Sequence, residues 1–135
     1  MQDFDAIADD YITLDDAEDR YRLLIELGRT LPPMPPALKT DASKVRGCSA
    51  NVWVYPVEEG GRLNFLADSD AHITKGIVAL IVALVDGRTP ADLKALDIEG
   101  RLAPFELSRQ LSANRTQGIP SMIALVRQTA ERLGA

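Results

Sequence analysis

The stretch from Ile73 to Val85 constrains the fold more than any other part of the sequence. It is almost continuously apolar, yet it is shorter than the about 20 residues that a membrane-spanning helix needs. One stripe at helical spacing consists of Ile73, Ile77, Leu80, Ile81 and Leu84. Three valines, Val78, Val82 and Val85, widen this apolar stripe. A helix that is apolar almost all round lies inside a core. We therefore expect a central helix over Ala71–Val85, capped by Ser69 or Asp70, with Gly76 allowing close approach to a sheet.

Helical periodicity also appears before and after this stretch. The spacing of Phe4, Ile7, Ala8 and Tyr11 predicts a short amphipathic helix near the start. A second helix is expected from about Asp16 to Leu27, with Asp15 as its N-cap and Gly28 as its stop. Its predicted buried stripe is Ala17, Tyr21, Leu24 and Ile25. Further helices are expected from the cap Thr89-Pro90 through Leu96, around Pro104 to Gln110, and from Ile119 with Pro120 in the first turn.

Between the second helix and the central one, the pattern changes from helical to alternating. Apart from Pro56, residues 52–57 are β-branched or aromatic, and residues 63–67 alternate. Glu58-Glu59-Gly60-Gly61 lies between them, so these residues predict a β-hairpin. A short strand through Val45 is expected as a third member. Helices before and after a small contiguous sheet favour a single α+β domain over residues 1–135, with an antiparallel sheet of about three strands.

Charge and composition limit the classes of function. The formal charge is -5, so a basic nucleic-acid-binding face and attraction to an anionic membrane are not expected. The first ten residues are acidic and lack the pattern of a signal peptide. The chain has one cysteine, which excludes an internal disulfide and fits a reducing compartment. These features predict a soluble, cytoplasmic domain.

The single cysteine, Cys48, lies in unusual surroundings for a thiol that only packs in a core. Gly47 precedes it, and three nearby cations, Lys39, Lys44 and Arg46, outnumber Asp41 in that stretch. Cations favour the thiolate, which is the nucleophilic form, and glycine lets the backbone come close to a reacting partner. The alternative is an inert thiol buried at the start of a strand. The residues alone leave both interpretations open.

Other kinds of site find less support. His72, the only histidine, could form a nucleophilic dyad with Cys48, but no motif surrounds the pair and a surface histidine is the simpler interpretation. One cysteine and one histidine cannot supply a usual zinc site, and Asp68 and Asp70 lack the further oxygen ligands of a calcium loop. No phosphate-binding or dinucleotide-binding motif is present, so no cofactor is expected. Arg115 is either a solvated residue at a helix start or a residue that meets the thiol segment or a partner.

Several segments taken together resemble the SufE family of sulfur-acceptor proteins across nearly the whole chain. The first is Tyr21 to Leu31, followed by prolines, and the second is Val45, Gly47, Cys48, Val52 and Trp53. The others are Asp68-Ser69-Asp70-Ala71 with Lys75-Gly76, Gly87-x-Thr89-Pro90, and Leu111-Ser112 with Arg115 and Gly118. Their common order and spacing make the resemblance specific.

The resemblance implies a carrier of sulfane sulfur in iron–sulfur cluster assembly, an accessory protein rather than a self-contained enzyme. Such a carrier takes the persulfide of a pyridoxal-phosphate cysteine desulfurase of the SufS or CsdA type, stimulates that enzyme, and passes the sulfur to a scaffold such as SufBCD. Cys48 would be the acceptor. Arg46, Gly47, Asp70, Lys75 and Arg115 would support the acceptor segment or contact the partner. The fold would also resemble the IscU scaffold, but this chain lacks the three cysteines that scaffolding needs.

Two positions depart from the family pattern. Ser49-Ala50 follows the cysteine where Gln-Ser is common, and Asn114 stands where a serine is common. Two alternatives to the carrier are kept: a small regulatory or interaction domain with a structural cysteine, and a cysteine hydrolase that uses His72.

Overall fold

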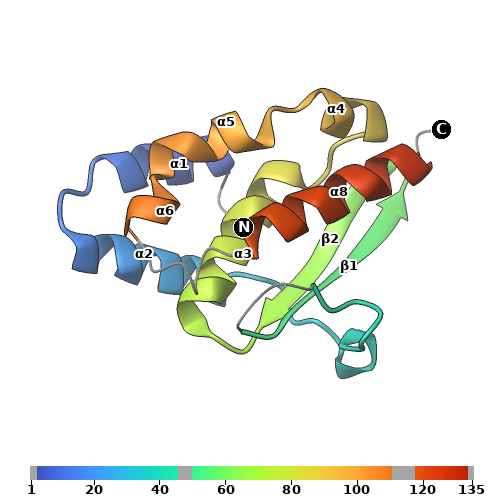
Figure 1. The fold of residues 1–135 in the computed structure, drawn as a ribbon, viewed down its shortest axis with the longest axis horizontal. Coiled ribbons are helices and arrows are strands. Elements are labelled where there is room, and N and C mark those ends of the chain that lie inside the picture. Colours follow the sequence, from blue (N-terminus) through green and yellow to red (C-terminus); the bar gives the residue numbers. More distant parts are fainter. Residues whose placement is uncertain (1–2, 46–49, 111–117, 134–135) are drawn as a thin grey trace.

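The computed structural model describes residues 3–45, 50–110 and 118–133. Helices pack with one β-hairpin in an α+β arrangement, with α3 running through the middle (Figure 1). The first half holds α1 (Phe4–Ile12), α2 (Ala17–Arg29), η1 (Pro36–Leu38), β1 (Val52–Glu59), β2 (Arg62–Ser69) and α3 (His72–Val85). The second half holds α4 (Pro90–Ala95), α5 (Ile98–Leu102), η2 (Ala103–Phe105), α6 (Leu107–Gln110) and α8 (Ile119–Leu133). The α+β class expected from the sequence is therefore confirmed.

The helix α3 is the core element, as its apolar sequence predicts. Its buried residues are Gly76, Ile77, Val78, Ala79, Leu80, Ile81, Val82, Leu84 and Val85. The expected role of Gly76 is wrong in one respect, because its close neighbour is α2 and not the sheet. A Cβ at Gly76 would lie 2.1 Å from the backbone oxygen of Leu24. The missing side chain thus lets the backbones of α2 and α3 meet.

The two strands and the turn of the hairpin lie where the sequence predicts them. β1 and β2 pair antiparallel, with Val52 opposite Ser69 and Glu59 opposite Arg62. Gly60 and Gly61 have φ values of 58° and 80°. Positive φ at both central residues identifies a type I′ turn, whose twist matches that of the strands it joins.

The expected third strand is reduced to an isolated bridge, Lys44 to Trp53, in the described residues. Two backbone hydrogen bonds join this segment to β1: Val45 N–H donates to Val52 O (2.8 Å), and Val54 N–H donates to Ser43 O (2.9 Å). Pro56, two residues further along the same edge, has no N–H to continue the ladder. A tight turn over residues 40–43 also directs the chain away, since Ser43 Oγ accepts from Thr40 N–H. The sheet is therefore two-stranded.

The N-terminal helices form where expected, with different ends for α2. Its N-cap is Asp16 and not Asp15, because the Asp16 carboxylate accepts from Glu18 N–H at 2.9 Å. Gly28 does not stop the helix, which continues to Arg29. The buried residues of α2 are Leu24, Leu27 and Gly28. The predicted stripe is therefore correct at Leu24 and partly at Tyr21, which packs partly buried against the core, whereas Ala17 is exposed.

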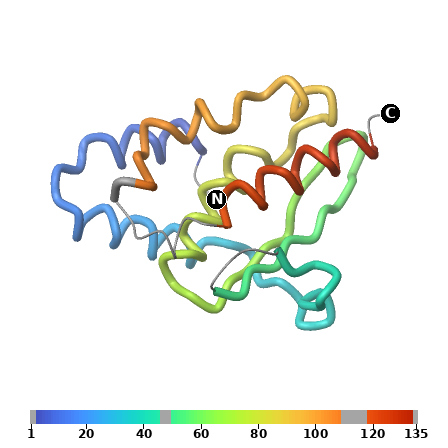
Figure 2. Tube along the Cα trace, in the orientation of Figure 1, coloured from blue at the N-terminus to red at the C-terminus, as the bar shows by residue number. Residues whose placement is uncertain are grey.

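Among its described residues, the C-terminal half contains one helix that the sequence pattern did not predict. Thr89 caps α4 and Pro120 lies in the first turn of α8, both as expected. The unpredicted helix α5 is only five residues long, and Asp97 caps it. α5 lies beside α1 (Figure 2), where Arg101 binds Asp5 at 2.8 Å and its guanidinium lies over the Phe4 ring. None of the described helices is both long and apolar enough to span a bilayer.

Candidate functional site

The predicted site residues divide into two groups. Arg46, Gly47, Cys48 and Arg115 lie outside the described residues. Asp70 and Lys75 lie in the described part, at the end of β2 and in the first turns of α3. The chain leaves the described residues after Val45 and returns at Ala50. The described residues near these two points are here called the frame.

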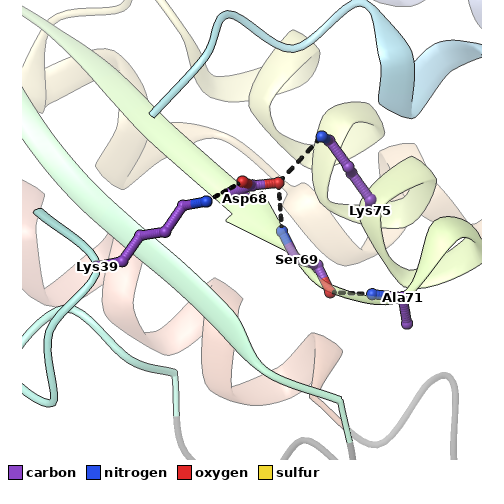
Figure 3. A network of polar contacts seen from close by, with 5 residues as sticks. All are labelled: Lys39, Asp68, Ser69, Ala71 and Lys75. Atoms are coloured by element: carbon purple, nitrogen blue, oxygen red, sulfur yellow. Dashed lines mark hydrogen bonds and ion pairs between the residues drawn. The ribbon is translucent and has the colours of Figure 1, made fainter. Parts of the chain in front are cut away.

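A carboxylate at the end of β2, Asp68, is the centre of this frame (Figure 3). Lys39 Nζ lies 2.6 Å from its Oδ2, and Lys75 Nζ lies 3.1 Å from its Oδ1. The Ser69 N–H also donates to Oδ1, at 2.8 Å. The Asp68 side chain is 15% exposed, and those of Lys39 and Lys75 are 29% and 32% exposed. Three segments, namely the chain before Val45, the end of β2 and the start of α3, therefore meet at one carboxylate.

The environment of Asp68 favours its ionised form. Burial by itself raises the pKa of a carboxyl group, but here the hydrogen bonds from Lys39, Lys75 and the Ser69 amide outweigh it. The pKa of Asp68 therefore lies below its ordinary value. Two ammonium groups around one carboxylate leave this cluster with a net positive charge.

Trp53 links the same cluster to β1. Lys39 Nζ lies 5.4 Å from the centre of the Trp53 ring, within the range of a cation–π interaction. Trp53 stands opposite Asp68 in the hairpin register. Lys39 thus contacts residues on both strands.

Asp70 holds the chain where it returns to the described residues. Its Oδ1 accepts from Asn51 N–H at 3.1 Å, its Oδ2 accepts from the Asn51 side-chain amide at 2.7 Å, and its own N–H donates to Asn51 O at 3.3 Å. Asp70 is therefore not the N-cap of α3, contrary to one expectation. Ser69 Oγ instead accepts from Ala71 N–H at 3.3 Å, and the N-cap position itself is Ala71, which has no capping side chain.

The structure thus brings Lys75 to Asp68, whereas Asp70 binds Asn51 separately. Sequence reasoning did not select Asp68 or Asn51 as site residues, because the sequence does not show which side chains they bind. Lys39 stood out only as one of several cations near the cysteine. His72 begins α3 and is exposed. Over the described ranges, no three histidine, cysteine or acidic side chains gather closely enough to hold a metal ion.

Similarity to known proteins covers almost the whole chain. Residues 5–130 match the SufE family, described as an Fe-S metabolism associated domain. An uncharacterized SufE-like protein of Rhizobium meliloti (strain 1021) is 40% identical, over 97% of this chain and 96% of its own length. The sulfur acceptor protein CsdE of Escherichia coli (strain K12) is 41% identical, over 78% of this chain and 72% of its own. A solution structure of a hypothetical protein from Thermus thermophilus has a similar fold, with a TM-score of 0.76 at 18% identity over 96% of this chain and 94% of that one.

Proposed function

Since this chain belongs to the SufE family, we propose that it carries sulfur for iron–sulfur cluster assembly as a persulfide on Cys48. One observation carries the proposal: the chain is 41% identical to a protein named a sulfur acceptor and contains a single cysteine. Sulfur that binds covalently to a thiol of this protein must therefore bind at Cys48. The donor would be a pyridoxal-phosphate cysteine desulfurase of the SufS or CsdA type.

The transfer needs no oxidant. The Cys48 thiolate attacks the outer sulfur of the donor's cysteine persulfide, and a new S–S bond forms on Cys48 as the donor's S–S bond breaks. The donor cysteine leaves as a thiolate, and the transferred sulfur keeps its hydrogen. The number of thiolates, sulfur atoms and electrons is therefore the same before and after the transfer. Attack by a further acceptor on the outer sulfur returns Cys48 to the thiolate.

The remaining parts of the proposal concern partners and place. Removing the persulfide frees the desulfurase for another turnover, so the carrier stimulates that enzyme. A scaffold of the SufBCD type receives the sulfur. A reducing compartment such as the cytoplasm suits a lone thiol that has to stay free for transfer. In the free protein we expect Cys48 to be sheltered and to become accessible when the desulfurase binds.

The test is intact-mass measurement after incubation with a desulfurase and L-cysteine. The wild type is expected to gain sulfur, whereas Cys48→Ser gains none. His72→Ala is the matched control for the hydrolase alternative and is expected to gain sulfur as the wild type does. If the wild type stays unmodified while the desulfurase turns over, the carrier proposal is wrong and the interaction-domain alternative gains support.

A further inference from the structure

The chain segment Lys39 to Val45, here called the upstream arm, leads directly into the segment that carries Cys48. The arm is attached to the hairpin at both of its ends. Near Cys48 it is attached by the hydrogen bond from Val45 N–H to Val52 O, at 2.8 Å. At the far end it is attached by one side chain, that of Lys39, which binds Asp68 and lies over Trp53.

The Lys39 attachment differs from an ordinary surface ion pair. Exposed pairs contribute little because water screens them and two long side chains lose freedom. Here Asp68 is 15% exposed, the Lys39 Nζ to Asp68 Oδ2 distance is 2.6 Å, and the aromatic ring restricts the lysine from a further direction. Such a contact restrains the backbone at Lys39 as well as stabilising the folded protein.

We propose that Asp68 is a positioning residue for sulfur acceptance, which acts by holding Lys39 and through it the upstream arm. The inference rests on the proposed function, because it concerns the geometry in which Cys48 meets its donor. A group displaced by as little as about 1 Å from the geometry of reaction can lose about a hundredfold in rate, so fixing the arm affects the transfer step. Asp68 itself contacts no reacting atom in this account.

Removal of the carboxylate and removal of Lys39 break the attachment in different ways. Asp68→Asn leaves two cations, Lys39 and Lys75, around a neutral group, and their repulsion drives Lys39 away from Trp53. Lys39→Met removes the attachment without that repulsion. Lys39→Arg preserves the attachment, because a guanidinium binds a carboxylate and stacks on an aromatic ring.

The chain offers a matched control in Arg101. It also binds an aspartate, Asp5 at 2.8 Å, and also lies over an aromatic ring, that of Phe4 at 5.2 Å. Its side chain is 38% exposed, against 29% for Lys39, and Asp5 is 76% exposed, against 15% for Asp68, so the Arg101 pair is the more exposed of the two. Arg101→Met therefore removes the same kinds of contact from a part of the fold that does not lead to Cys48.

Two rates are measured for each variant. The first is the alkylation of Cys48 by iodoacetamide in the free protein, which reports on this thiol alone because the chain has no other. The second is persulfide formation from a CsdA-type desulfurase and L-cysteine, at several carrier concentrations. Asp68→Asn and Lys39→Met are expected to be alkylated about fivefold faster and loaded with sulfur about fivefold more slowly at saturation. Lys39→Arg and Arg101→Met should stay within about twofold of the wild type in both rates.

The outcomes separate this inference from the proposed function. If Lys39→Met and Asp68→Asn behave like Arg101→Met, or are loaded as fast as the wild type, the positioning role is overturned while the carrier function stands. If the wild type accepts no sulfur, the carrier function fails, and the alkylation rates still decide whether Asp68 and Lys39 restrain the chain near Cys48. Should Asp68→Asn not fold, the comparison of Lys39→Met with Lys39→Arg decides alone.

Discussion

Asp68 and Glu99 are both carboxylates held by cations, but water reaches them to different degrees. The Asp68 side chain is 15% exposed, whereas that of Glu99 is 58% exposed and binds Arg127 on α8. Hydrogen bonds from Arg127 lower the pKa of Glu99, and the pKa of Asp68 is lowered in spite of its burial. A charge pair in water is screened by salt, while a partly buried pair is screened much less.

A lowered folded-state pKa makes stability depend on pH in a definite direction. The stabilisation from Asp68 is present above its ordinary pKa near 3.8 and is lost as the pH falls through the lower folded value. We therefore expect the wild type to lose stability on acidification from about pH 6 to about pH 2 more steeply than Asp68→Asn. Urea unfolding at a series of pH values measures the difference. The corresponding difference for Glu99→Gln should vanish in high salt, and a salt-sensitive difference for Asp68→Asn would contradict the prediction.

At the level of single residues, the sequence shows which charged side chains are present but not what they contact. The cations near Cys48 and the pair Asp68 and Asp70 are visible in the sequence, but their partners are not. Asp70 precedes a helix, where a cap is the common role, yet it binds Asn51, which lies 19 residues away. Lys39 and Asp68 are likewise distant in sequence. The hairpin register places Trp53 opposite Asp68, and the path of the chain before Val45 brings Lys39 to both.

The crossing of α2 over α3 depends on glycine at the point of closest approach. A Cβ at Gly76 would lie 2.1 Å from Leu24 O, which is backbone and cannot turn aside. Gly76→Ala would gain about 1 kcal/mol of helix propensity if nothing obstructed it. The steric conflict should outweigh this gain and leave the variant about 2–3 kcal/mol less stable.

Urea unfolding followed by circular dichroism measures this loss in stability. Gly60→Ala is the control: Gly60 has a φ of 58° and no atom within 4 Å of the place that a Cβ would occupy, so only backbone strain of about 1 kcal/mol is expected there. A Gly76→Ala variant as stable as the wild type would show that α2 and α3 can separate without cost.

At the level of elements, local patterns predicted what depends on local forces. The turn at Gly60-Gly61, the Thr89 cap and the position of Pro120 were all predicted, because they follow from backbone preferences of single residues. The third strand failed because a strand requires repeated pairing, and Pro56 together with the turn at Ser43 ends the pairing after one bridge. The neighbour of Gly76 was also mistaken, because a helix that is apolar all round does not reveal which neighbour lies on which side.

One continuous cluster of buried residues joins the elements of the whole molecule. It extends from Phe4 in α1 through α3 and the hairpin to Ala130 in α8. The sequence predicts this core from the apolar stretch of α3, which neighbouring elements have to cover. It does not predict the route by which Lys39 reaches Asp68, since that depends on how the chain passes around the hairpin. The environment of Cys48 itself lies outside the described residues.

A single core of this kind predicts that the chain unfolds as one domain. Helices dominate the far-ultraviolet circular dichroism, while Trp53, the only tryptophan, reports on the hairpin beside the Lys39 contact. Because α3 packs on both α2 and β2, loss of either side exposes its apolar residues, so the two signals should change together in urea. Coincident midpoints and equal slopes support one cooperative unit over residues 1–135. If Trp53 fluorescence changes at lower urea than the dichroism, the hairpin opens separately from the helices, and the frame around Cys48 is a distinct and weaker part of the molecule.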